Sequence, residues 1–201
     1  MQKLKIEKGT DNKILRTKSE KAGRAAHLKC GMNLADFAKN MKEVLDSEKG
    51  LGLSAPQVGE NVRICLCRFN TGTPNEVLFV LVNPEITWMS EECEVGEEGC
   101  LSLPGYYVGV SRAKEVTVKF LDGRGLLKGK GGALRNGMVI GKKMSWVKGS
   151  LPEMTLNLSG LNARLVQHEL DHLNGVLICD KAVDAAEKVY NIFGNIQKVT
   201  F

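Results

Sequence analysis

Apolar residues recur at a helical spacing in two parts of the chain. Over residues 33–48, a period of three to four residues predicts an amphipathic helix whose buried stripe holds Leu34, Phe37, Met41, Val44 and Leu45. A second amphipathic helix is predicted from about Gly160 to about Leu173, with Ser159 as its N-cap and Asn174-Gly175 as its stop. Its inward stripe holds Leu161, Leu165, His168 and His172, so two histidines face the protein interior.

Strands are predicted ahead of the second helix. Segments rich in Val, Ile, Phe and Tyr occupy residues 62–67, 77–82, 106–112 and 115–121, and Asp122-Gly123 marks a turn. Gly50 and Gly52 alternate with leucines, which is typical of an edge strand on which an extended peptide can lie, although a mobile loop is the alternative. Because the strands cluster ahead of a central helix, we predict an α+β fold with antiparallel strands around that helix.

Residues 124–155 and the tail depart from this pattern. Glycines and lysines are frequent in residues 124–155, which we interpret as an insertion between two strands. It predicts a surface loop or an extra hairpin around 138–140 and 144–147, with a substrate lid or a partner-docking arm as the functional alternative. The tail, from about Val183 to Phe201, predicts a short amphipathic helix through Val189, Ile192 and Phe193.

Composition limits the class of protein. A chain of 201 residues with 43% hydrophobic and 25% charged residues is expected to form one soluble domain, 1–201. No apolar stretch approaches the ~20 residues of a membrane span, and the N-terminus lacks an apolar signal core. Six cysteines without a compact spacing fit a reducing cytoplasm. The net charge of +5 is spread along the chain, so we favour solubility over docking near ribosomal RNA and infer no nucleic-acid-binding module.

Candidate chemistry lies on the second helix. His168 and His172 stand one turn apart on one face and can reach the same metal ion, and Glu169 beside them can act as a general base on water. A catalytic site of this type takes a third protein ligand. After His172 the candidates are Cys179, Asp180, Asp184 and Glu187. Before it, Cys100 lies in a loop-like context among acidic residues and glycine, whereas we interpret the other five cysteines as structural.

Three motifs together carry a family resemblance. They are Gly50-Leu51-Gly52-Leu53-Ser54-Ala55-Pro56-Gln57, Glu98-Gly99-Cys100-Leu101-Ser102 and Gln167-His168-Glu169-Leu170-Asp171-His172. The same motifs occur in the same order in the peptide deformylases, which remove the N-formyl group from nascent polypeptides. The chain resembles this family over most of residues 1–123 and 156–180. Two departures stand out: Ser54 replaces the usual alanine, and the connection after Asp122-Gly123 is much longer than in the family.

The resemblance implies a role for each motif residue. It makes Cys100, His168 and His172 the metal ligands, Glu169 the general acid and base, and Gln57 and the Leu101 backbone N–H donors to the formyl oxygen. Substrate contacts are expected at Gly50, Leu51, Gly52, Glu98 and Gly99. The implied cofactor is one divalent ion per chain, Fe²⁺ in the cell, with Zn²⁺, Ni²⁺ or Co²⁺ able to substitute. The implied partners are an N-formyl-Met peptide and, transiently, the ribosome, with no membrane.

Two other interpretations stay open. A zinc metallopeptidase could use the same helix, and it would need a ligand after His172. A non-catalytic binding module could keep the fold, but such a module would be expected to lack Glu169, Gln57 or a ligand, and all are present.

Overall fold

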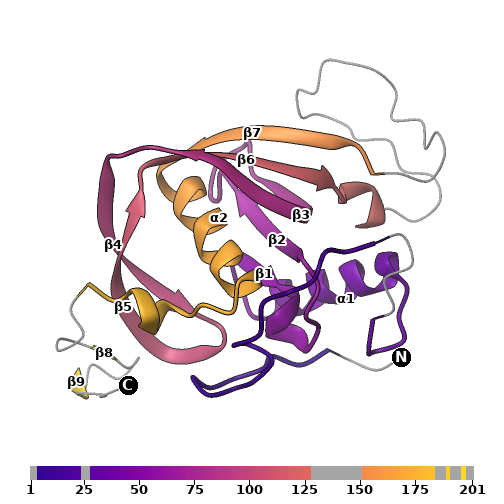
Figure 1. Ribbon diagram of the computed structural model, residues 1–201, viewed down its shortest axis with the longest axis horizontal. Coiled ribbons are helices and arrows are strands. Elements are labelled where there is room, and N and C mark those ends of the chain that lie inside the picture. Colours follow the sequence, from indigo (N-terminus) through magenta and orange to yellow (C-terminus); the bar gives the residue numbers. More distant parts are fainter. Residues whose placement is uncertain (1–3, 24–27, 128–150, 184–188, 191–195, 198–201) are drawn as a thin grey trace.

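One helix, α2 (Gly160–Leu173), lies at the centre of the molecule, between a five-stranded sheet and a long two-stranded hairpin (Figure 1). The computed structural model describes residues 4–23, 28–127, 151–183, 189–190 and 196–197. All strand ladders within it are antiparallel. This arrangement confirms the predicted α+β fold with antiparallel strands around a central helix.

The five-stranded sheet has the order β1-β2-β3-β6-β7. Its strands are β1 (Gly52–Ser54), β2 (Ile64–Phe69), β3 (Val77–Met89), β6 (Glu115–Asp122) and β7 (Glu153–Ser159). The side chains of β2 alternate between two cores: Cys65 and Cys67 pack with α2 residues, whereas Ile64 and Leu66 pack with those of α1 (Leu34–Ser47). Burial on both faces explains why β2 is a continuous apolar run from Ile64 to Cys67, ahead of the half-buried Arg68.

The two predicted helices are present, with corrections to the second. α1 begins after Asn33, whose side chain accepts a hydrogen bond from the Asp36 N–H, and it buries the predicted stripe from Phe37 to Leu45. Ser159 holds the N-cap position of α2, but its side chain makes no capping hydrogen bond. Leu161, predicted to face inward, is 55% exposed, because it lies in the first turn, before α2 reaches the core.

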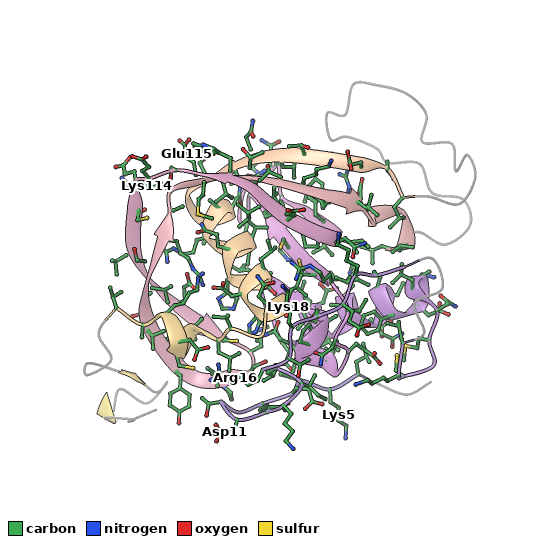
Figure 2. All side chains as sticks on the ribbon, viewed as in Figure 1. Lys5, Asp11, Arg16, Lys18, Lys114 and Glu115 are labelled. Atoms are coloured by element: carbon green, nitrogen blue, oxygen red, sulfur yellow. The ribbon has the colours of Figure 1, made fainter. Side chains whose placement is uncertain are left out.

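The hairpin consists of β4 (Cys93–Cys100) and β5 (Leu103–Ala113), which form a ladder of their own. Lys114 and Glu115 mark the corner where β5 leads into β6 (Figure 2). At this corner the Lys114 carbonyl accepts a hydrogen bond from the Gly160 N–H at 3.1 Å. The prediction of a loop-like context for Cys100 is wrong, because Cys100 is the last residue of β4. β4 was not predicted as a strand, because its sequence is rich in acidic residues and glycine.

Strand boundaries differ from the prediction at Asn83-Pro84 and after residue 150. β3 continues to Met89 because the ladder shifts register between Val82 and Glu85, which accommodates a proline without an N–H. β7 was not predicted, so residues 153–155 belong to a strand rather than to an insertion. At the other end, residues 124–127 form η2 (Arg124–Leu127). The proposed hairpin around 138–140 and 144–147 lies outside the described residues.

The tail contains no helix where the structure describes it. After η3 (Ile178–Lys181) come two short strands, β8 (Val189–Tyr190) and β9 (Ile196–Gln197), which pair antiparallel. The predicted amphipathic helix is therefore wrong at these residues, and Ile192 and Phe193 lie outside the described part of the chain. No helix in that part is long and apolar enough to cross a membrane.

Candidate metal centre

Three potential ligands meet between α2 and the end of β4. The rings of His168 and His172, one helical turn apart, have centroids separated by 5.0 Å, and both side chains are buried. The Cys100 thiol lies 3.2 Å from the Nε2 atom of His172. One potential ligand atom from each of the three residues lies within 4.8 Å of the others, the only such group in the described ranges. Of the candidates for a third ligand, Cys100 is thus the one that the structure brings to the two histidines.

The downstream candidates for a third ligand face elsewhere. Arg16 forms an ion pair with Asp180 and a hydrogen bond with the Cys179 thiol. Figure 2 shows Arg16 at the lower edge of the molecule, beside η3. Asp184 and Glu187 lie outside the described residues. The ligand set required by a metallopeptidase therefore gains no support from Cys179 or Asp180.

The chemistry of the cluster fits a metal ion. Burial alone would raise the pKa of the Cys100 thiol, but the adjacent His172 and His168 outweigh it and hold this pKa well below its usual range. Burial likewise opposes the charge on His168, but hydrogen bonds to Cys100 and Glu98 raise its pKa to about 10. The thiol is therefore held as a thiolate, the form that binds metals. The charged His168 ring carries a second proton, besides the one on Nδ1, and a metal ion can take the place of this second proton.

Glu98 orients the His168 ring through the nitrogen that faces away from the cluster. The Nδ1 atom of His168 lies 2.9 Å from the Glu98 carboxylate, and since a carboxylate only accepts, Nδ1 carries the proton and leaves Nε2 for the cluster. Burial would raise the pKa of Glu98, but hydrogen bonds from Arg112 and His168 lower it to about 2. Arg112 donates twice and Arg164 once to this carboxylate, each at 2.9 Å. The Glu98 side chain is therefore placed to orient a candidate ligand, and Glu98 also lines the cleft where the substrate contact is predicted.

Glu169 is placed by a close approach to the backbone of β1. Its carboxylate lies over Gly52, where an added Cβ would stand 2.1 Å from Oε1. Oε2 is buried without a hydrogen-bond partner among the described residues. Burial, opposed by the nearby His168 and His172, raises the pKa of Glu169 to about 7. A carboxyl group with this pKa can both accept and return a proton at neutral pH.

Gln57 reaches the cluster from η1 (Ala55–Val58). Its Oε1 atom accepts hydrogen bonds from the Ser54 N–H at 2.8 Å and from the Ser54 hydroxyl at 3.0 Å, so Nε2 must point the other way. Nε2 donates to the Cys100 thiol at 3.6 Å. The serine that departs from the usual alanine thus adds a second bond that fixes the amide. Leu101 begins the turn after Cys100, beside the same cluster.

A cleft of about 880 Å³ opens onto these groups. Its lining includes the predicted residues Gly50, Leu51, Gly52, Gln57, Glu98, Gly99, Cys100, Leu101, His168 and Glu169. His172 is buried and is not part of the lining. Sequence reasoning missed Tyr106 and Tyr107 on the hairpin, and it missed both arginines that hold Glu98. The one available indication was the position of Arg164, one helical turn before His168.

Comparisons with known proteins agree with the motifs. A model of the polypeptide deformylase family matches residues 4–128 and 143–188. A peptide deformylase of Prochlorococcus marinus (strain NATL1A) is 37% identical over 151 residues, which are 75% of this chain and 62% of that protein. A peptide deformylase of a Synechococcus species is 35% identical over 150 residues, which are 75% of this chain and 61% of that protein. The chain therefore spans less than two thirds of the length of these two relatives.

Solved structures of similar proteins have the same fold. The crystal structure of a peptide deformylase from Thermotoga maritima aligns with a TM-score of 0.68 at 30% identity, covering 92% of this chain and 100% of that one. A probable peptide deformylase from the Synechococcus phage S-SSM7 aligns with a TM-score of 0.66 at 31% identity, covering 89% and 99% of the two chains.

Proposed function

This chain belongs to the polypeptide deformylase family, and we propose that it is a metal-dependent hydrolase that removes the N-formyl group from the formyl-Met of nascent polypeptides and releases formate. The observation that carries this proposal is the approach of Cys100, His168 and His172 to within 4.8 Å, where Cys100 and His168 line a cleft together with Glu169. Three protein ligands leave a position for water, as a catalytic site requires.

Each remaining residue is assigned one task. When bound, a divalent ion supplies the Lewis acidity that makes water acidic enough to ionise near neutral pH. Glu169 takes the proton of the attacking water and gives it to the leaving amine, a role that suits its raised pKa. Gln57 Nε2 and the Leu101 N–H donate to the formyl oxygen as negative charge develops there, and Ser54 keeps the amide in the donating orientation.

The substrate is assigned to the open edge of β1. This strand ends the five-stranded sheet, so its outer backbone groups can pair with an extended peptide. Gly50, Leu51 and Gly52 line the cleft on this side, and Gly99 lines it from β4. A formyl-Met peptide bound there would lay its N-terminus towards Glu169.

The finer assignments rest on chemistry and on the family. A thiolate with two imidazoles suits Fe²⁺ or Zn²⁺, and we assign Fe²⁺ in the cell, with Zn²⁺, Ni²⁺ or Co²⁺ as substitutes. The six cysteines are all free thiols, which fits the cytoplasm, where nascent chains emerge and transient ribosome contact would take place. We treat residues 1–201 as one catalytic domain with extra residues between η2 and β7.

The proposal is tested by metal analysis together with release of formate. The purified protein, loaded with Fe²⁺ or Co²⁺ without oxygen, is expected to bind one ion per chain and to release formate from a formyl-Met tripeptide. The matched acetyl-Met tripeptide should remain intact. Cleavage of internal peptide bonds would favour the metallopeptidase, and a metal-loaded protein that releases no formate would refute the proposed activity.

A further inference from the structure

The hairpin that carries Cys100 has no ladder to the rest of the described sheet strands. Its strands, β4 and β5, form a ladder only with each other, and β5 adds an isolated bridge from Val110 to Ala182. Both histidines lie on α2, between the hairpin and the five-stranded sheet. A two-stranded hairpin is marginally stable by itself. The distance between the thiol and the two imidazoles therefore depends on the contacts that hold β4 and β5 against α2.

Side chains of α2 supply these contacts from one stripe of the helix. The stripe, here called the polar stripe, contains Arg164, Gln167, His168 and Asp171. Gln167 exchanges two hydrogen bonds with the backbone of Ala113, at the base of the hairpin. Asp171 forms an ion pair with Arg112 of β5. These residues fasten β5, and Arg164 is the member of the stripe that reaches along β4.

Arg164 contacts both strands through one guanidinium group. Its Nη2 donates to the Glu94 carbonyl at 2.7 Å, and its Nη1 lies 2.8 Å from the Val110 carbonyl and 3.3 Å from the Gly96 carbonyl. Nη1 also lies 2.9 Å from the carboxylate of Glu98, two residues before Cys100. The three β4 residues alternate along the strand and so share the face that meets α2.

Gly96 makes this flat contact possible. A Cβ at residue 96 would stand 2.8 Å from the guanidinium carbon and 2.9 Å from Nη2 of Arg164. The guanidinium therefore lies directly on the backbone of β4. Any larger residue at this position would have to push it away.

We propose that Arg164 is a positioning residue for the metal centre, because it fastens β4 to α2 and so sets Cys100 at ligating distance from His168 and His172 before the ion arrives. The inference rests on the metal site proposed above. The task is separate from that of Arg112, which donates two hydrogen bonds to Glu98 and would hold that carboxylate in place without Arg164. Loss of Arg164 therefore loosens the strand while leaving the Glu98–His168 bond.

Metal affinity of the folded protein is the readout. We expect Arg164→Ala to weaken Co²⁺ binding, measured by chelator competition, by about 10–100-fold, the usual cost of losing support behind a ligand. The thiolate-to-cobalt absorption band should weaken or shift as well. Arg164→Lys keeps the charge but offers one compact donor, so its Co²⁺ affinity should fall between those of the wild-type protein and Arg164→Ala. A role in stability alone would lower the melting temperature and leave affinity and absorption unchanged.

A second pair of variants displaces the guanidinium without removing it. Gly96→Ala should weaken Co²⁺ binding in the same direction as Arg164→Ala. Its matched control is Gly109→Ala on β5, where a Cβ meets only Val95 at 3.5 Å and Val183 at 3.8 Å, so affinity should be unchanged. If Gly96 acts through the guanidinium, adding Gly96→Ala to Arg164→Ala should cause no further loss.

The outcomes separate this inference from the proposed function. Wild-type affinity and spectrum in Arg164→Ala would overturn the inference and leave the metal site intact. An equal loss in Gly96→Ala and Gly109→Ala would also overturn it. A wild-type protein that binds no divalent ion would overturn the metal site itself, and the inference with it. If Arg164→Ala does not fold, Gly96→Ala and Arg164→Lys carry the same comparison.

Discussion

Replacing Gly52 by alanine perturbs the proposed general base without touching a ligand. The new Cβ would stand 2.1 Å from Oε1 of Glu169, 2.7 Å from Cδ and 2.9 Å from Cγ. Ordinary contact begins at 3.4 Å, so from 2.1 Å the carboxylate oxygen must retreat by about 1.3 Å. The backbone of β1 is harder to displace than the Glu169 side chain, because β1 is hydrogen-bonded to β2. The side chain of Glu169 must therefore move.

A displacement of this size has a calculable effect on rate. A misplacement of ~1 Å in an active site can reduce turnover ~10²-fold. At ~1.36 kcal/mol for each tenfold change, this corresponds to about 2.7 kcal/mol of lost transition-state stabilisation. The metal content should remain that of the wild-type protein, because the three atoms nearest to the new methyl group all belong to Glu169 and none to a candidate ligand. We therefore expect kcat to fall about a hundredfold in a fully loaded enzyme.

The assay compares kcat for formyl-Met tripeptide with the metal content of the same preparation. Gly109→Ala is the control for a glycine-to-alanine change in a strand, and it should keep normal kcat. Shortening the base relieves the clash, so Gly52→Ala should cost less in a Glu169→Asp background than in the wild type. Near-normal kcat in metal-loaded Gly52→Ala would refute the assignment of Glu169 as the base held over β1.

Four further predictions concern the base, the thiol ligand and, in two cases, the extra residues. Glu169→Gln should keep the metal and lose at least ~10²–10⁴-fold in kcat, and normal turnover would contradict its role. Cys100→Ser should lose metal on dialysis and Cys179→Ser should keep it; equal retention would point to another ligand set. Deleting 129–142, which the family model leaves unmatched, should leave formate release intact, since loop closure changes by only ~0.6 kcal/mol per halving of length. Replacing 125–152 should instead unfold the protein, measured by circular dichroism, because it removes leucines packed on the α1 core.

The ligand pair on α2 could be predicted because it is local. Two residues four apart on a helix share a face whatever the rest of the chain does, so the sequence alone places His168 beside His172. Cys100 is separated from them by more than sixty residues, and no periodicity connects β4 with α2. From the sequence, only the family resemblance assigns Cys100 to the metal site. In the structure, the packing of β4 against α2 brings Cys100 to the two histidines.

The errors in the fold come from elements whose burial is decided by distant neighbours. β4 has no apolar alternation, because the face that meets the polar stripe of α2 carries Glu94, Gly96 and Glu98 and the other face meets water. β7 does alternate, with Met154, Leu156 and Leu158 packed on the core, but its first residues were assigned to the glycine-rich segment before it. Leu161 matches the helical period and yet is exposed, since periodicity says nothing about where the core ends.

The arginines behind the metal centre illustrate a deeper limit. In the sequence, only its place one helical turn before His168 separates Arg164 from a solvated charge on a helix, and nothing separates Gly96 from a flexible residue in a polar segment. Only the crossing of β4 over α2 turns them into a contact, in which the guanidinium fits because position 96 has no side chain. The ligand motif can therefore be complete while the geometry that makes it useful is held elsewhere. A chain with all three motifs and a bulky residue at position 96 would be expected to bind its metal more weakly.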